Sequence, residues 1–160
     1  MSSKLKAVFG TYALVLESTC RVTITVGALG TVQVLPGFYV YIGSAFGPGG
    51  LRGRLLNHLR KRNSPHWHID YLRVLTMPAE AWISTEPTRR EHDWALALAE
   101  SPAVSTPISR FGASDCRCPS HLFYLGRSWS RSSCGRLLVS IGASSLECVS
   151  GLAGWEMSLP

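Results

Sequence analysis

Strand-forming segments fill the first 45 residues and limit the folds that this chain can adopt. Four segments rich in β-formers are separated by glycine or proline turns, and they cover residues 8–16, 20–26, 31–35 and 38–45. In the second segment Val22, Ile24 and Val26 alternate with polar residues, which is the period of a half-buried strand. Because short turns join neighbouring antiparallel strands, we expect an antiparallel meander here.

Helical patterns begin after the glycine-rich loop at residues 47–50. Leu51, Leu55 and Leu59 recur on one side of an expected helix over residues 51–61. Further along, the pattern predicts a short helix or turn, a strand, a helix and a last strand, over residues 67–74, 81–84, 85–101 and 121–125. This mixture of elements predicts an α+β fold.

The character of the chain changes after Leu125. Residues 126–160 contain nine serines and five glycines, and only residues 137–141 show a weak periodicity. We therefore expect one domain over residues 1–125, followed by a Ser/Gly-rich, poorly structured extension over residues 126–160.

Composition excludes several classes of protein. Hydrophobic residues make up 46% and charged residues 16% of the chain, which is a globular composition. No apolar run approaches the roughly 18 residues of a membrane-spanning helix, and Gly10 interrupts the apolar stretch near the start, which argues against a secretory signal. We expect a cytoplasmic protein that does not associate with membranes. The odd number of cysteines, five, favours reduced thiols or a metal site over disulfides.

Positive charge is concentrated in one part of the sequence. The formal net charge is +6, and no acidic residue occurs between Glu17 and Asp70. A basic stretch without carboxylates suits the phosphate backbone of a nucleic acid, although a solvated positive face would look the same. The basic residues of this stretch are Arg21, Arg52, Arg54, Arg60, Lys61 and Arg62.

Two tyrosines and the first helix suggest a site for chemistry. Tyr12 lies on the first expected strand and Tyr41 on the strongest one. Arg54 and His58 are four residues apart, so they project together, and we expect them on the side away from the leucines. The N-terminal amides of a helix after a glycine-rich turn favour an anion. A phenol, a guanidinium and an imidazole could thus surround a phosphate.

These residues also resemble a known family. Residues 10–12 (Gly-Thr-Tyr) and 41–43 (Tyr-Ile-Gly) are similar to the two signature tripeptides of GIY-YIG nucleases. Arg54 stands where that family has its helix arginine, and residues 89–91 resemble the start of its metal-binding helix. The match is closer to one branch, the domain of unknown function 123, which is also found fused to endonuclease III. The segments similar to that branch are residues 37–50, 66–71 and 116–124.

The resemblance implies a small central antiparallel sheet flanked by helices. This chain departs from the wider family in one respect, because its strand pair at residues 20–35 is inserted as a β-hairpin between the two tripeptides. The resemblance also implies metal-dependent hydrolysis of a phosphodiester, with Mg²⁺ (or Mn²⁺) as cofactor. Glu91 would hold the metal, although Asp93 is a rival, and Arg54 would clamp the phosphate oxygens. The expected catalytic residues are Tyr12 on the attacking water, Tyr41 as a second phenol, Arg54, His58 as proton relay or phosphate ligand, and Glu91.

The expected partner is nucleic acid, DNA in the first instance, together with a DNA-repair protein. Trp67 could stack on a base. The residues expected to contact the nucleic acid are Arg52, Arg60, Lys61, Arg62, His66, Trp67 and His68. His66, His68 and Asp70 alternate and could instead ligate a metal. The late asparagine used by many of these nucleases has no counterpart, because the chain contains only Asn57 and Asn63.

Cys116, Cys118 and His121 form a compact group near the last expected strand. With a fourth ligand from elsewhere this group could bind zinc. The alternative is that these residues line the groove or hold the last strand. Three hypotheses follow: a metal-dependent nuclease acting in DNA repair, a nucleic-acid-binding module without catalysis that assists a repair enzyme, and a zinc-stabilised interaction domain.

Overall fold

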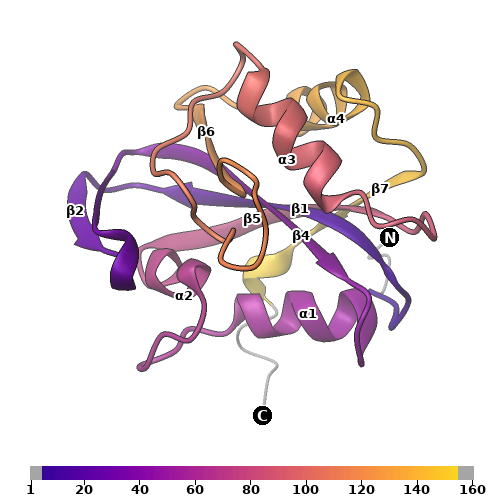
Figure 1. The fold of residues 1–160 in the computed structure, drawn as a ribbon, viewed down its shortest axis with the longest axis horizontal. Coiled ribbons are helices and arrows are strands. Elements are labelled where there is room, and N and C mark those ends of the chain that lie inside the picture. The colour runs from indigo at the N-terminus through magenta and orange to yellow at the C-terminus, as the bar shows by residue number, and fades with distance from the viewer. Residues whose placement is uncertain (1–4, 155–160) are drawn as a thin grey trace.

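A five-stranded antiparallel sheet forms the centre of the computed structural model, which describes residues 5–154. Strand β1 (Gly10–Ser18) is the middle strand, between β4 (Gly37–Ala45) and β5 (Thr76–Ser84). The edges are β6 (Leu122–Gly126), beside β4, and β7 (Leu146–Ser150), beside β5. The sheet with its surrounding helices confirms the predicted α+β class (Figure 1).

A separate hairpin is inserted between the first two strands of the sheet. It consists of β2 (Val22–Thr25) and β3 (Thr31–Val34), joined by the short 3₁₀ helix η1 (Gly27–Leu29). The prediction of a meander is therefore wrong, because β1 skips the hairpin and pairs with β4 over nine residues. The reason is burial: β1 and β4 are apolar on both faces and belong inside the sheet, whereas β2 has alternately exposed residues.

Helices cover both faces of the sheet (Figure 1). On one face, α1 (Gly50–Leu59) and α2 (His68–Arg73) pack against Tyr12, Leu14 and Leu16 of β1. On the other face, α3 (Glu91–Glu100) and α4 (Arg131–Ser140) pack against the alternate residues Ala13 and Val15. The period of two along β1 thus separates two hydrophobic cores. Within residues 5–154, no helix has the length and apolar character needed to cross a membrane.

The segment after β6 differs from the expected poorly structured extension. Residues 131–150 form α4 and the edge strand β7, in which Cys148 lies opposite Trp82 of β5. Gly135 lets the indole of Trp82 pack directly on α4, because a Cβ there would lie 2.8 Å from the ring. Apolar side chains of α4 and contacts with distant β5 hold this segment in place. The last part of the expected extension, residues 155–160, lies outside the described residues.

Candidate active site

A cavity of about 530 Å³ opens between α1, the beginning of α3 and the ends of β1 and β4. The structure brings all five expected catalytic residues to its wall: Tyr12, Tyr41, Arg54, His58 and Glu91. Three of the expected nucleic-acid contacts, His66, Trp67 and His68, line it as well. Residues that sequence reasoning missed at this cavity include Ser44, Arg89 and Asp115.

Strand register explains why the two tyrosines meet. Tyr12 lies opposite Gly43, and Tyr41 is two residues from Gly43 on the same strand, so the two rings share one face of the sheet. A Cβ at Gly43 would overlap the phenol of Tyr12. The glycine of the second tripeptide is therefore required for space, because the Tyr12 ring crosses over the neighbouring strand at this point.

Tyr12 and His58 form a close polar pair in the cavity. The phenol oxygen lies 2.6 Å from Nε2 of His58, and both side chains are buried. The expectation that His58 faces away from the leucines is wrong. His58 follows Leu55 by three residues and Leu51 by seven, so it belongs to the same helical stripe and points at the sheet.

Burial sets the protonation of this pair. Desolvation raises the pKa of Tyr12 and of Tyr41 well above the usual value of a phenol, and the nearby Arg54 offsets this only in part. Desolvation also lowers the pKa of His58 to about 3, and the charges of Arg54, Arg62 and Arg73 act in the same direction. At neutral pH a protonated phenol therefore faces a neutral imidazole, which can accept the phenol's hydrogen at Nε2.

The depressed pKa of His58 predicts a specific loss of stability in acid. The unfolded chain takes up a proton near pH 6.5, whereas the folded chain takes it up only near pH 3, so stability falls as pH drops through this window. We expect the wild-type free energy of unfolding to fall by about 2 kcal/mol more than that of His58→Gln between pH 6.5 and about pH 5. Urea unfolding of both proteins at the two pH values measures this difference. Equal losses in the two proteins would contradict it.

Glu91 is the first residue of α3 and points into the cavity. Ser44 Oγ donates to Glu91 Oε2 at 2.5 Å, and His121 Nδ1 lies 3.2 Å from Oε1. Burial opposes ionisation of this carboxyl, but the hydrogen bonds from His121 and Ser44 and the charge of His121 bring its pKa below the usual value. Glu91 is therefore an ionised carboxylate with fixed orientation.

The start of α3 is fastened to the first strand. Thr11 Oγ1 accepts a hydrogen bond from the backbone N–H of Arg90 at 3.1 Å. The hydroxyl of Thr11, the middle residue of the first tripeptide, therefore anchors the helix that carries Glu91. The rival ligand Asp93 pairs with Arg90 at 3.3 Å, is 60% exposed and is absent from the cavity wall. The geometry favours Glu91.

Trp67 supports the guanidinium of Arg54. The Arg54 Cζ lies 5.5 Å from the centre of the Trp67 ring, and that of Arg62 lies at 5.6 Å. Such contacts hold a cation over an indole and stabilise it by about 0.5–2 kcal/mol. The edge of Trp67 also contacts the ring of His58, with centroids 5.4 Å apart. Trp67 therefore packs against the guanidinium groups of Arg54 and Arg62 and against the imidazole of His58.

The other expected contacts are spread more widely. Arg52, Arg60 and Lys61 are exposed on or just after α1 and do not line the cavity, and Arg62 lies 3.9 Å from buried Asp70. Asp70 Oδ2 accepts the backbone N–H groups of residues 66 and 67. His68 Nδ1 accepts the N–H of Gly112 at 2.8 Å. Within residues 5–154, His66, His68 and Asp70 do not form a metal-binding group.

A different group of side chains that could hold a metal ion lies beside the cavity. Cys116, Cys118 and His121 come together as expected, and His92 of α3 completes the group. His92 was not expected here, because it lies 24 positions before Cys116 and only the tertiary structure brings the two together.

Comparison with known proteins identifies the family. Neither the search of curated proteins nor the search of solved structures gave a match. The family model described as a domain of unknown function, DUF123, matches residues 11–155 and so includes α4 and β7. The cavity, both tripeptides and the Cys/His group all lie within or at the edge of that match. The chain belongs to the DUF123 family.

Proposed function

We propose that the chain is a divergent GIY-YIG nuclease that hydrolyses a phosphodiester of DNA with the help of a divalent metal ion. The convergence of Tyr12, Tyr41, Arg54, His58 and Glu91 on one cavity carries this proposal. These groups come from β1, β4, α1 and α3, so only the tertiary fold assembles them. Acid–base groups, a cation and a carboxylate in one cavity are the components of phosphoryl transfer.

Arg54 binds the phosphate in this proposal. Arg54 lines the cavity and packs over the ring of Trp67, and its guanidinium offers the forked N–H donors that suit phosphate oxygens. Arg89 also lines the cavity and adds positive charge. Fixed cations beside a transferring phosphate stabilise the charge that builds on its oxygens, which lowers the barrier to cleavage.

The donor set around Glu91 fits Mg²⁺ or Mn²⁺. Glu91 contributes an ionised carboxylate at the wall of the cavity, and neighbouring groups contribute hydroxyl oxygens. A hard cation of this kind prefers oxygen ligands and keeps several waters, so one carboxylate suffices to hold it. When bound, such an ion supplies Lewis-acid stabilisation of the phosphate and the leaving oxygen.

Tyr12 and His58 move the proton. Because Tyr12 is protonated in the free protein, it becomes a base only by passing its own proton to Nε2 of the neutral His58. The attacking water then gives its proton to the Tyr12 oxygen as the new P–O bond forms. The bond from phosphorus to the leaving oxygen breaks, and that oxygen takes a proton from solvent, while His58 releases to solvent the proton that it accepted from Tyr12. Tyr41 contributes a second phenol at the same wall.

A cleavage assay tests the proposal. Purified protein is incubated with single-stranded, duplex and branched DNA, each with Mg²⁺, Mn²⁺ or EDTA, and RNA of the same sequence forms a further arm. We expect cleavage of DNA that requires the metal. DNA binding without cleavage would instead identify a binding module that assists a repair enzyme. Absence of both binding and cleavage would remove nucleic acid as the partner.

A further inference from the structure

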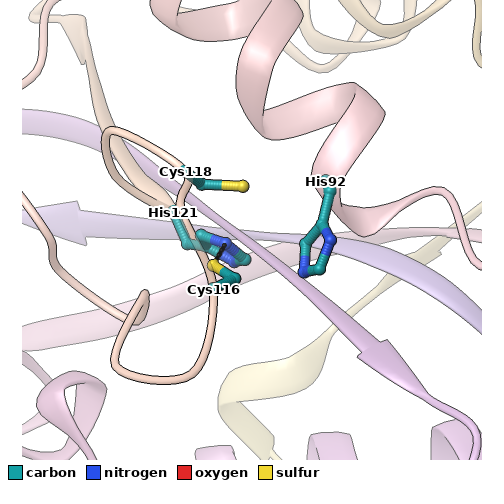
Figure 2. Close-up of side chains that lie close together, drawn as sticks. All are labelled: His92, Cys116, Cys118 and His121. Carbon is teal, nitrogen blue, oxygen red and sulfur yellow. Dashed lines mark hydrogen bonds between the residues drawn. The ribbon is translucent and has the colours of Figure 1, made fainter.

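Four metal-ligating side chains meet beside the candidate active site. Cys116, Cys118 and His121 lie on the loop before β6, and His92 lies in the first turn of α3. Their ligand atoms all lie within 4.8 Å of one another. Figure 2 shows the His92 ring directed from the helix toward the loop that carries the other three.

We propose that these four residues form a structural zinc site. Two cysteines and two histidines are a ligand set of closed, tetrahedral zinc sites, with Zn–S near 2.3 Å and Zn–N near 2.0–2.1 Å. Such bonds place ligand atoms roughly 3.3–3.8 Å apart. Cys116 Sγ and His121 Nε2 already lie at 3.4 Å, and the widest pair has to close by only about 1 Å.

The loop that carries both cysteines is held in shape by Arg110. Its guanidinium donates to the backbone carbonyls of Ala113, Cys116 and Cys118 at 2.5–2.9 Å. Its backbone N–H donates to the carbonyl of Pro119 at 2.7 Å. The two thiols are therefore positioned by contacts that do not depend on the metal, which lowers the entropy lost when it binds.

His121 has the outer contacts typical of a metal ligand. While Nε2 faces Cys116, Nδ1 lies 3.1 Å from the carbonyl oxygen of Ile42 and 3.2 Å from Glu91 Oε1. Ligating histidines usually donate their second ring N–H to a carboxylate or a backbone carbonyl, which fixes the tautomer and the ring. The proposed zinc would therefore fasten the start of α3 to the loop and hold His121 against Glu91.

Metal content of the purified full-length protein tests the proposal. The chain is produced in zinc-supplemented medium, purified with a reductant, desalted and analysed by mass spectrometry of the elements. We expect about one zinc per chain, and loss of most of it in Cys118→Ser. Cys20→Ser is the matched control, because Cys20 lies outside the group, and it should keep its zinc. Cobalt replacing the zinc should give the thiolate charge-transfer absorption of a tetrahedral site, which Cys118→Ser should lack.

His92→Ala keeps the test decisive if the cysteine variant fails to fold. His92 is exposed, so its removal leaves the core intact. The variant should bind zinc more weakly in competition with a chelator. Loss of a residue that merely hydrogen-bonds to a metal ligand lowers metal affinity by roughly 10–100-fold, and loss of the ligand His92 itself should cost at least as much. Wild-type protein without zinc, or equal zinc content in Cys118→Ser and wild type, would overturn the site. Unchanged affinity in His92→Ala would overturn the assignment of His92. None of these measurements depends on DNA cleavage.

Discussion

If the proposed nuclease mechanism holds, we expect Arg54→Ala to lower the kcat of metal-dependent DNA cleavage by about 10²–10³-fold, which is the usual effect of removing one charge-stabilising donor from a catalytic site. Arg54 lines the cavity wall, where its guanidinium packs over the ring of Trp67. Glu91→Gln should lower kcat at least as much. The amide keeps the shape of the side chain and can still contact Ser44, but it lacks the charge that holds the metal.

Steady-state cleavage of the preferred DNA, with metal in excess, measures both effects. Arg136→Ala is the control for loss of one surface arginine, since Arg136 is exposed on α4, outside the cavity wall. It should cleave like wild type. Thermal unfolding of every variant shows whether the fold is intact. Turnover at the wild-type rate in a folded Arg54→Ala or Glu91→Gln protein would remove that residue from the mechanism.

Some of the placements within the candidate site follow from local geometry. Alternation along β1 and β4 places Tyr12 and Tyr41 on one face, and helical spacing brings Arg54 and His58 together. The same helical spacing in fact places His58 in the apolar stripe of α1. Its polar character led to the opposite expectation, although a buried imidazole is acceptable where a phenol satisfies Nε2.

The parts that the sequence did not predict depend on contacts between distant segments. Glu91 owes its orientation to Ser44, 47 residues away, and α3 is anchored by Thr11, 79 residues away. The segment of α4 and β7 shows only weak periodicity in its sequence. In the structure β7 pairs with the edge of β5, and apolar side chains of α4 pack in the same core as Trp82 of β5. Propensity and periodicity describe neighbours along the chain, so neither could reveal these pairings.

Arg73→Ala destabilises the fold by about 3–5 kcal/mol, because it removes a large buried side chain and leaves buried carbonyls without donors. The Arg73 side chain is fully buried. Its Nε donates to the carbonyl oxygen of His58 and its Nη2 to that of Leu59, both at 2.9 Å, while Nη1 donates to Thr76 at 2.5 Å. The last carbonyls of a helix lack intrahelical partners, so Arg73 caps α1 and joins it to β5.

Urea unfolding at neutral pH measures this loss, with Arg136→Ala again as the exposed control, expected within about 0.5 kcal/mol of wild type. A loss below about 1 kcal/mol for Arg73→Ala would contradict the capping role. The substitution should also affect His58 in the candidate active site. Arg73 is one of the charges that lower the pKa of His58, so in a folded Arg73→Ala protein this pKa should rise, as an NMR titration of the imidazole can show. The buried guanidinium therefore both closes the helix and keeps its histidine neutral, so that Nε2 can accept the hydrogen bond of the Tyr12 phenol.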